Sequence, residues 1–153
     1  DMQIEVFLNE EKVQADIRPD MMLLDFLRSM NLKSMKRGCD TGNCGLCTVW
    51  VDGKPVLSCG VPAARVQGAH ITTLEGVQEE AAEFSRFLAA EGADQCGFCS
   101  PGLIMNVLAL KKENPHPTEE EMKEYLAGNL CRCTGYQGQY RALAKYFEIE
   151  EAQ

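Results

Sequence analysis

Residues 38–47 read Gly-Cys-Asp-Thr-Gly-Asn-Cys-Gly-Leu-Cys, and another cysteine follows at position 59. Three cysteines spaced C-x4-C-x2-C with a distant fourth form the plant-type arrangement of [2Fe-2S] ligands. The interleaved glycines let the backbone turn its N–H groups toward cluster sulfurs. Zinc sites favour paired C-x2-C arms, so zinc and disulfides are weaker alternatives. The sequence therefore predicts a [2Fe-2S] site held by Cys39, Cys44, Cys47 and Cys59.

The other four cysteines form a second group. Residues 95–102 read Gln-Cys-Gly-Phe-Cys-Ser-Pro-Gly, and residues 130–136 read Leu-Cys-Arg-Cys-Thr-Gly-Tyr. This spacing alone would equally suit zinc. Each half precedes a helical pattern, with Ser100 expected as an N-cap and Pro101 as a first helical residue, so helix N-termini can face a negatively charged cluster. We therefore predict a second four-thiolate site at Cys96, Cys99, Cys131 and Cys133.

Alternating apolar residues predict a small sheet in the first half of the chain. Strands are expected over 3–8 and 13–17 around a turn at 9–12, and over 48–51 and 55–59 around Asp52-Gly53. A last strand is expected over 70–74, and helical spacing predicts a helix over 21–30. Residues 1–75 are therefore expected to form an α+β domain.

From residue 76 onward the apolar period becomes helical. Stripes around 84–88 and 103–108 predict two helices, the second ending at Asn114-Pro115. Thr118 and Glu121 predict a capping box that opens a third helix with Leu130 on its apolar face, and residues 140–147 form the fourth. We expect residues 76–153 to form a four-helix domain around the second cysteine group.

Composition excludes several classes of protein. The chain has 153 residues and is 45% hydrophobic and 25% charged, with no apolar run long enough to cross a membrane. Its net charge of −8 argues against nucleic acid as a partner. The first residues carry no secretion signal, so we expect a cytoplasmic location. The two histidines, His70 and His116, are not close in sequence to a nucleophile, and we expect no acid–base catalysis and no catalytic residues on this chain.

Four motifs together carry a family resemblance. They are, in order, G-C-D-T-G-N-C-G-L-C-T-V, D-G-K-P-V-L-S-C, Q-C-G-F-C-S-P-G and N-L-C-R-C-T-G-Y. Over residues 3–147 the chain resembles the iron–sulfur subunit of a molybdenum hydroxylase, in the xanthine dehydrogenase and aldehyde oxidase family. The resemblance implies an N-terminal ferredoxin-like β-grasp domain followed by a C-terminal four-helix [2Fe-2S]-binding domain. It also implies a hetero-oligomer with a molybdopterin-binding large subunit and an FAD-binding medium subunit.

The resemblance also implies roles for individual positions. The cluster at Cys96, Cys99, Cys131 and Cys133 would lie nearer molybdenum, and that at Cys39, Cys44, Cys47 and Cys59 would face the flavin. Gln95 and Cys133 would contact the pterin. Two departures stand out. Leu46 replaces a small alanine, which would tighten packing over the first cluster. Gln139-Tyr140 replaces an apolar pair, so the fourth helix is expected to start later or to meet a different partner surface.

The first hypothesis is thus an electron-transfer subunit of a molybdenum-containing oxidoreductase, relaying electrons from a molybdopterin site to FAD or another acceptor. The alternatives are a stand-alone ferredoxin or redox sensor, and a zinc-stapled interaction module. The substrate pocket would belong to another chain, and we expect a purine or another N-heterocycle as substrate.

Overall fold

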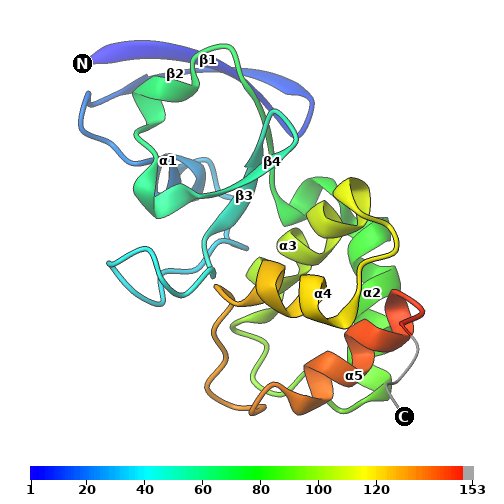
Figure 1. Ribbon diagram of the computed structural model, residues 1–153. Helices are drawn as coiled ribbons and strands as arrows, with labels where there is room; N and C mark the ends of the chain where they lie inside the picture. Colours follow the sequence, from blue (N-terminus) through cyan, green and yellow to red (C-terminus); the bar gives the residue numbers. More distant parts are fainter. Residues whose placement is uncertain (150–153) are drawn as a thin grey trace.

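A five-stranded mixed sheet forms the first part of the computed structural model, which describes residues 1–149 (Figure 1). Its strands are β1 (Met2–Leu8), β2 (Glu11–Ile17), β3 (Thr48–Val51), β4 (Lys54–Leu57) and β5 (His70–Thr72). The spatial order is β2-β1-β5-β3-β4. The β1·β5 pair is parallel, and the other pairs are antiparallel.

Both predicted hairpins are confirmed. Asn9 and Glu10 have φ of 49° and 69°, and Asp52 and Gly53 have φ of 50° and 81°. Two consecutive residues with positive φ make the tight turns whose twist matches that of paired strands. The first turn is therefore shorter than the sequence suggested, and β2 begins at Glu11. Cys59, expected at the end of a strand, instead lies in the 3₁₀ turn η1 (Ser58–Gly60).

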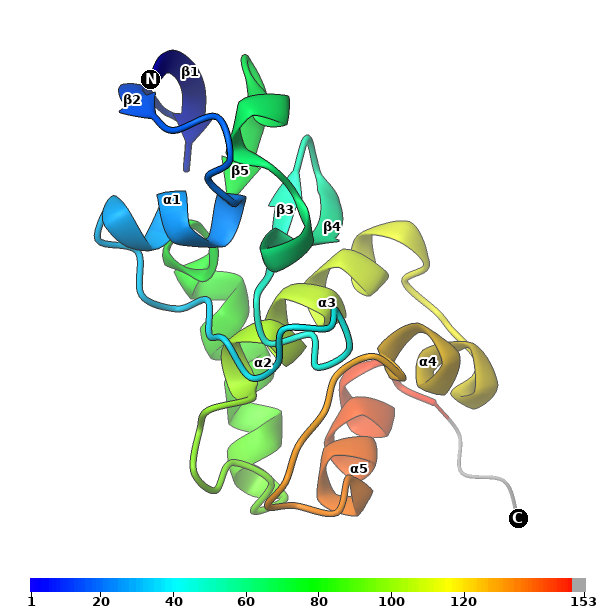
Figure 2. The ribbon, with the colours of Figure 1, turned by 90° about the vertical axis from the view of Figure 1, so that its left-hand side faces the viewer.

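One face of the sheet is covered by the helix α1 (Leu23–Ser29), which confirms the helix expected over 21–30 (Figure 2). Its apolar side chains are almost fully buried against residues of the sheet such as Ile4, Val6 and Ile71. Burying a side chain of this size contributes about 1.5–3 kcal/mol relative to leaving it exposed. The 3₁₀ turns η2 (Ala63–Val66) and η3 (Leu74–Gly76) flank β5. The sheet and α1 hold in place the loop that carries the first cysteines.

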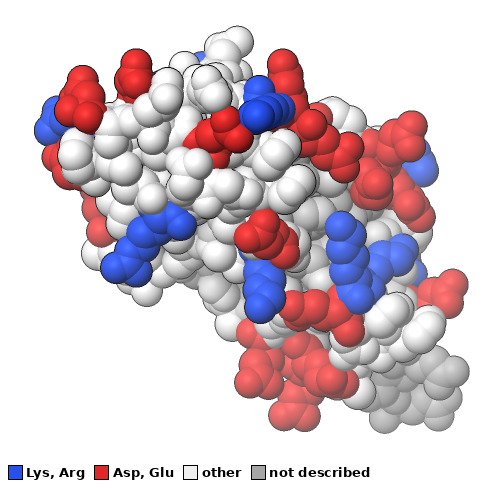
Figure 3. Space-filling view, turned by 90° about the horizontal axis from the view of Figure 1, so that it is seen from above, with Lys and Arg blue, Asp and Glu red and all other residues white. Residues whose placement is uncertain are grey.

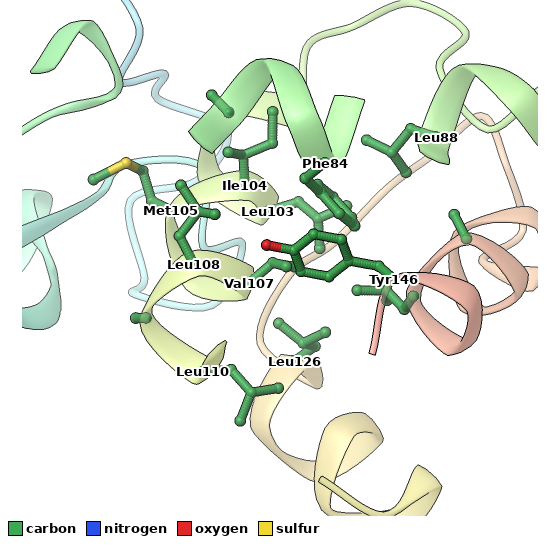
Figure 4. Close-up of a cluster of buried hydrophobic side chains, with 14 of the residues drawn as sticks. Phe84, Leu88, Leu103, Ile104, Met105, Val107, Leu108, Leu110, Leu126 and Tyr146 are labelled. Atoms are coloured by element: carbon green, nitrogen blue, oxygen red, sulfur yellow. The ribbon is translucent and has the colours of Figure 1, made fainter. Parts of the chain in front are cut away.

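Four helices form the second part, as predicted. They are α2 (Gln78–Ala90), α3 (Ser100–Glu113), α4 (Glu119–Leu126) and α5 (Gln137–Tyr146). Figure 4 shows Tyr146 of α5 and Phe84 of α2 meeting side chains from α3 in the core between the helices. The rings of Phe84 and Tyr146 meet edge to face at 5.0 Å, a favourable aromatic geometry. The packing of this core fixes the helix ends that the cysteine loops connect.

The helix α3 joins the two parts. Its residues 102–105 and 107–110 are all buried, which is typical of a helix with neighbours on every side. On the sheet side, Trp50 of β3 donates a hydrogen bond from Nε1 to the carbonyl oxygen of Met105 at 3.0 Å. Trp50 thereby belongs to the same buried cluster as the helical residues. The two parts share a continuous interface rather than a flexible linker.

Several helix boundaries differ from the expectation. Cys99, not Ser100, is the N-cap of α3, because the Cys99 carbonyl oxygen accepts the first hydrogen bond of the helix, from Leu103 N at 3.1 Å. Ser100 is thus the first helical residue and Pro101 the second. The capping box of Thr118 and Glu121 is confirmed. The placement of Leu130 on the third helix was wrong, because α4 ends at Leu126.

Charged side chains are mixed over the surface. On the face seen in Figure 3, basic side chains are separated by acidic ones and form no continuous basic stripe. Phosphate backbones are bound by clustered Lys and Arg, so this face gives no support for nucleic acid binding. Among the described residues, none of the helices is both long and apolar enough to pass through a bilayer.

Candidate metal centres

The first cysteine group lies where a loop meets one end of a hairpin. Cys39, Cys44 and Cys47 are on the loop between α1 and β3, and Cys59 follows β4. Because Thr48 of β3 pairs with Leu57 of β4, the residues just outside this pair share one end of the hairpin. A hydrogen bond links the two segments at that end, because Ser58 donates from Oγ to the Cys47 carbonyl oxygen at 2.7 Å. The hairpin thereby brings the distant fourth cysteine to the other three.

Backbone N–H groups of the first loop point at a sulfur. The N–H groups of Asn43 and Cys44 both donate to Cys39 Sγ at 3.4 Å. Together with the Thr41 N–H, which has the largest effect, they lower the pKa of the Cys39 thiol to about 6. Gly42, with φ of 73°, permits this turn of the backbone. The predicted inward donation to sulfur is therefore present in the structure.

The first four thiols lie close enough to influence one another. Cys39 and Cys44 are in contact, and burial is the main cause that raises the pKa of Cys44. Burial, followed by contact with Cys47, raises the pKa of Cys59 to about 11. These thiols cannot all ionise without a compensating positive charge. Bound metal supplies such a charge and deprotonates the thiols that coordinate it.

The second group joins two loops at one end of the helices. Cys96 and Cys99 lie on the loop between α2 and α3, and Cys131 and Cys133 on the loop between α4 and α5. Here Cys99 lies beside Cys131, and Cys96 lies beside Cys133. Burial, then contact with Cys131, raises the pKa of Cys99 to about 12.

Side chains provide the polar contacts of the second group. Thr134 donates from Oγ1 to Cys131 Sγ at 3.1 Å, and the Cys131 N–H donates to the Tyr136 hydroxyl at 2.9 Å. Gln139 donates from Nε2 to Cys99 Sγ at 3.6 Å. The sequence singled out neither Thr134 nor Tyr136 for these contacts. Thr134 and Tyr136 lie on the same loop as Cys131, whereas the contact between Gln139 and Cys99 joins residues 40 positions apart, which no local sequence pattern predicts.

The donor set of both groups fits a [2Fe-2S] cluster. Each group brings together four cysteine side chains from two segments of the chain. A [2Fe-2S] cluster is bound by four thiolates. Within residues 1–149, no three His, Cys, Asp or Glu side chains are arranged so that they could hold a single metal ion.

The two groups lie close together. Figure 2 shows the loop of residues 30–47 running beside the segment that follows α4. The Leu130 N–H donates to the Cys44 carbonyl oxygen at 2.9 Å. This bond to a distant loop explains why Leu130 is not part of the helix predicted to contain it. A hollow of about 330 Å³ is lined by Cys44 and Leu46 from one loop and by all four cysteines of the second group.

The remaining residues singled out by the sequence are placed as follows. Gln95 and Cys133 are both exposed. Leu46 is buried, and its Cδ1 would lie only 3.0 Å from a Cβ added at Gly38. The expectation that the fourth helix starts later was wrong, because α5 begins at Gln137 and includes Gln139 and Tyr140. His70 stacks on Phe7, and His116 is an exposed residue between α3 and α4.

Comparisons with known proteins agree with this architecture. Residues 6–72 match the family described as 2Fe-2S iron-sulfur cluster binding domain, and residues 73–144 match the [2Fe-2S] binding domain. The nicotinate dehydrogenase small FeS subunit of Eubacterium barkeri is 43% identical, and the match covers 87% of each chain. Aldehyde oxidase 2 of Rattus norvegicus is 41% identical over 88% of this chain, which spans only 11% of that protein.

A solved structure has the same fold. Quinoline 2-oxidoreductase from Pseudomonas putida 86 superimposes with a TM-score of 0.87 at 35% identity, over 95% of this chain and 92% of that one. The sheet and the four helices of the present chain are therefore an arrangement already seen in an oxidoreductase.

Proposed function

The chain belongs to the iron–sulfur subunits of the molybdenum hydroxylase family, and from this premise we propose that it relays electrons between a molybdopterin-binding large subunit and an FAD-binding medium subunit. Such subunits are the electron-transfer components of oxidoreductases and have larger partners. A [2Fe-2S] cluster supplies one-electron redox chemistry when bound. The chain's own residues hold the clusters, connect them and present them to partners.

The proposed ligands are the two groups of four cysteines. Residues 1–75, the ferredoxin-like domain, would hold one cluster, and residues 76–153, whose last four lie outside the described residues, would hold the other. The mutual influence of the thiols and the N–H groups directed at Cys39 support the first assignment. The pairs Cys99–Cys131 and Cys96–Cys133 support the second.

One observation carries the relay proposal: a hydrogen bond joins the two cysteine groups. The Leu130 N–H that donates to the Cys44 carbonyl oxygen at 2.9 Å belongs to the residue directly before Cys131. The path from Cys44 Sγ to Cys131 Sγ thus crosses covalent bonds and this one hydrogen bond.

The second group is the one proposed to face the molybdopterin subunit. Cys96 and Cys133 are exposed, and two large apolar side chains beside them are also unusually exposed, Phe98 at 47% and Leu130 at 46%. Exposed apolar side chains gathered around a hollow are typical of a protein contact. Gln95 adds an exposed amide next to Cys96, which supports its proposed contact with the pterin.

The proposed substrate is an N-heterocycle, and the proposed location is the cytoplasm. Nicotinate and quinoline, in the names of two similar proteins, are N-heterocycles, and we propose a substrate of this class, purines included. None of the eight cysteines is paired in a disulfide, and we place the complex in the reducing cytoplasm.

Metal analysis and spectroscopy test the assignment. About four iron and four sulfide per chain, with two distinct EPR signals on reduction, are expected from two [2Fe-2S] centres. A colourless protein containing zinc would refute the relay. Molybdenum and flavin subunits that co-purify with the chain would separate the relay from a stand-alone ferredoxin, which would purify without them.

Kinetics test the pterin contact. In the assembled enzyme, Gln95→Ala is expected to keep full iron and to slow cluster reduction by substrate, because about 0.5–1.5 kcal/mol of hydrogen bonding would be lost. Gln3→Ala, which removes an exposed amide on β1, is the matched control. Equal rates for the two variants in rapid mixing would reject the contact.

A further inference from the structure

Gln139 is a buried amide whose donor faces a sulfur. Its side chain belongs to the first turn of α5 and is only 4% exposed. Its Nε2 lies 3.6 Å from Sγ of Cys99, which is 40 positions away in the sequence. A buried amide is unfavourable unless it is hydrogen-bonded. The Cys99 sulfur is the acceptor that the structure provides for this N–H.

The surroundings of Gln139 fix the direction of its side chain. Tyr136, with φ of 72°, turns the chain into α5, and its hydroxyl accepts the N–H of Cys131. Gly138 and Leu143 are buried as α5 packs against α2. The helix therefore cannot rotate to expose the amide without unpacking. Gln139 is held between the loop of Cys99 and the loop of Cys131.

The second cysteine group has side-chain donors to sulfur in addition to backbone donors. At the first group, the donors to Cys39 Sγ are backbone N–H groups, which every residue except proline supplies. At the second group, backbone N–H groups also donate to Cys131, and two side chains add hydrogen bonds to sulfur, Gln139 to Cys99 and Thr134 to Cys131. Side-chain donors are set by residue identity. The electronic properties of the second group are thus open to adjustment by single substitutions.

We propose that Gln139 is a positioning residue that raises the reduction potential of the centre at Cys96, Cys99, Cys131 and Cys133. This inference rests on the proposed function, because it requires Cys99 to be a cluster ligand. Reduction adds one electron and so increases the negative charge on the ligand sulfurs. An N–H donor at Cys99 stabilises the reduced form more than the oxidised form. Gln139 keeps its protons throughout, and the same electron leaves to the acceptor.

The test is a redox titration followed by EPR on the full chain in its complex. Gln139→Leu removes the donor and keeps an apolar volume in the core. We expect the ratio of reduced to oxidised second centre to fall by up to about tenfold at a given potential, where tenfold corresponds to 59 mV for one electron. The first centre, in the same sample, should keep its potential. The matched control is Gln137→Leu, an identical change at an exposed position two residues earlier.

Iron and sulfide content separates failure of this inference from failure of the proposed function. If wild-type protein lacks two [2Fe-2S] centres, the proposed function is wrong. If both centres are present and Gln139→Leu and Gln137→Leu have the same potentials, Gln139 does not tune the second centre. Should Gln139→Leu lose iron, Gln139→Met, which has a similar unbranched shape, is titrated instead. Loss of the second centre from both variants would also overturn the inference, because it would show a structural role.

Discussion

Gly102→Ala is expected to destabilise the chain by forcing apart the two cysteine loops. A Cβ at Gly102, in the first turn of α3, would lie 2.4 Å from the Gly45 carbonyl oxygen and 2.9 Å from Leu46 Cα. Contacts of Cβ atoms below 3.0 Å essentially do not occur, so the helix and the loop would separate by at least about 0.6 Å. Both neighbours are backbone atoms and cannot rotate away.

The size of the effect follows from two opposing contributions. Overpacking of this kind typically costs about 1–3 kcal/mol. Alanine favours helix over glycine by about 1 kcal/mol, which offsets part of the strain. Because both clashing neighbours are backbone atoms, the cost should lie in the upper part of that range, at about 2–3 kcal/mol, and we expect a net loss of about 1–2 kcal/mol. For a chain of this length, 1 kcal/mol corresponds to roughly 2–4 °C, so the thermal midpoint should fall by roughly 2–8 °C.

Thermal unfolding followed by circular dichroism, at matched iron content and scan rate, measures this shift. Gly128→Ala is the control, because a Cβ there meets nothing within 4 Å and its φ is not positive. It should melt as the wild type does. If Gly102→Ala also melts with the wild type, the close approach of α3 to the loop does not constrain the chain. If both variants fall equally, the effect belongs to glycine replacement in general.

Three further predictions concern other parts of the molecule. Cys44→Ser should remove the first centre and leave about two irons per chain in a folded helical part, whereas loss of both centres would contradict separate sites. Thr118→Ala removes the capping box of α4 and should cost about 1 kcal/mol, measured as a lower thermal midpoint; an unchanged midpoint would mean that the cap contributes nothing. Burial of Glu75 opposes its ionisation, but hydrogen bonds from Ser34, Thr73 and its own backbone N–H together outweigh burial and hold the pKa below its ordinary value of 4.5. Stability from this carboxylate is present above that pH and is lost on acidification, so the midpoint difference between wild type and Glu75→Gln should shrink as pH falls below 4.5, and a constant difference would refute the assignment.

Local patterns predicted most of the fold. The hairpin turn at Asp52-Gly53 and the capping box of Thr118 and Glu121 depend on residues within four positions of each other, and both are confirmed. Leu130 fits a helical period equally well but lies outside the helix. Its N–H bonds Cys44, on a loop that no local pattern could relate to it. The error at Leu130 arises because a distant backbone group competes with a local preference.

The grouping of the candidate ligands was predictable from the sequence, but the surroundings of the site were not. Cysteine spacing is sufficient to propose two groups of four, because ligands of one cluster must share a loop or lie on neighbouring loops. Gln139, by contrast, reads in the sequence as a polar residue in an apolar position. Only the packing of α5 shows that its amide reaches Cys99. The alternative of a different partner surface at Gln139-Tyr140 stays a prediction.

The hydrogen bond between Cys44 and Leu130 also bears on how the protein is made. During synthesis the first cysteine loop leaves the ribosome long before residue 130, and domains generally fold in that order. Until Leu130 emerges, the Cys44 carbonyl must bond to water or to another donor. Gly45 likewise lacks the Gly128 backbone that later lies against it. The first cysteine loop of the nascent chain therefore lacks both of these backbone contacts until the residues that follow α4 have been made.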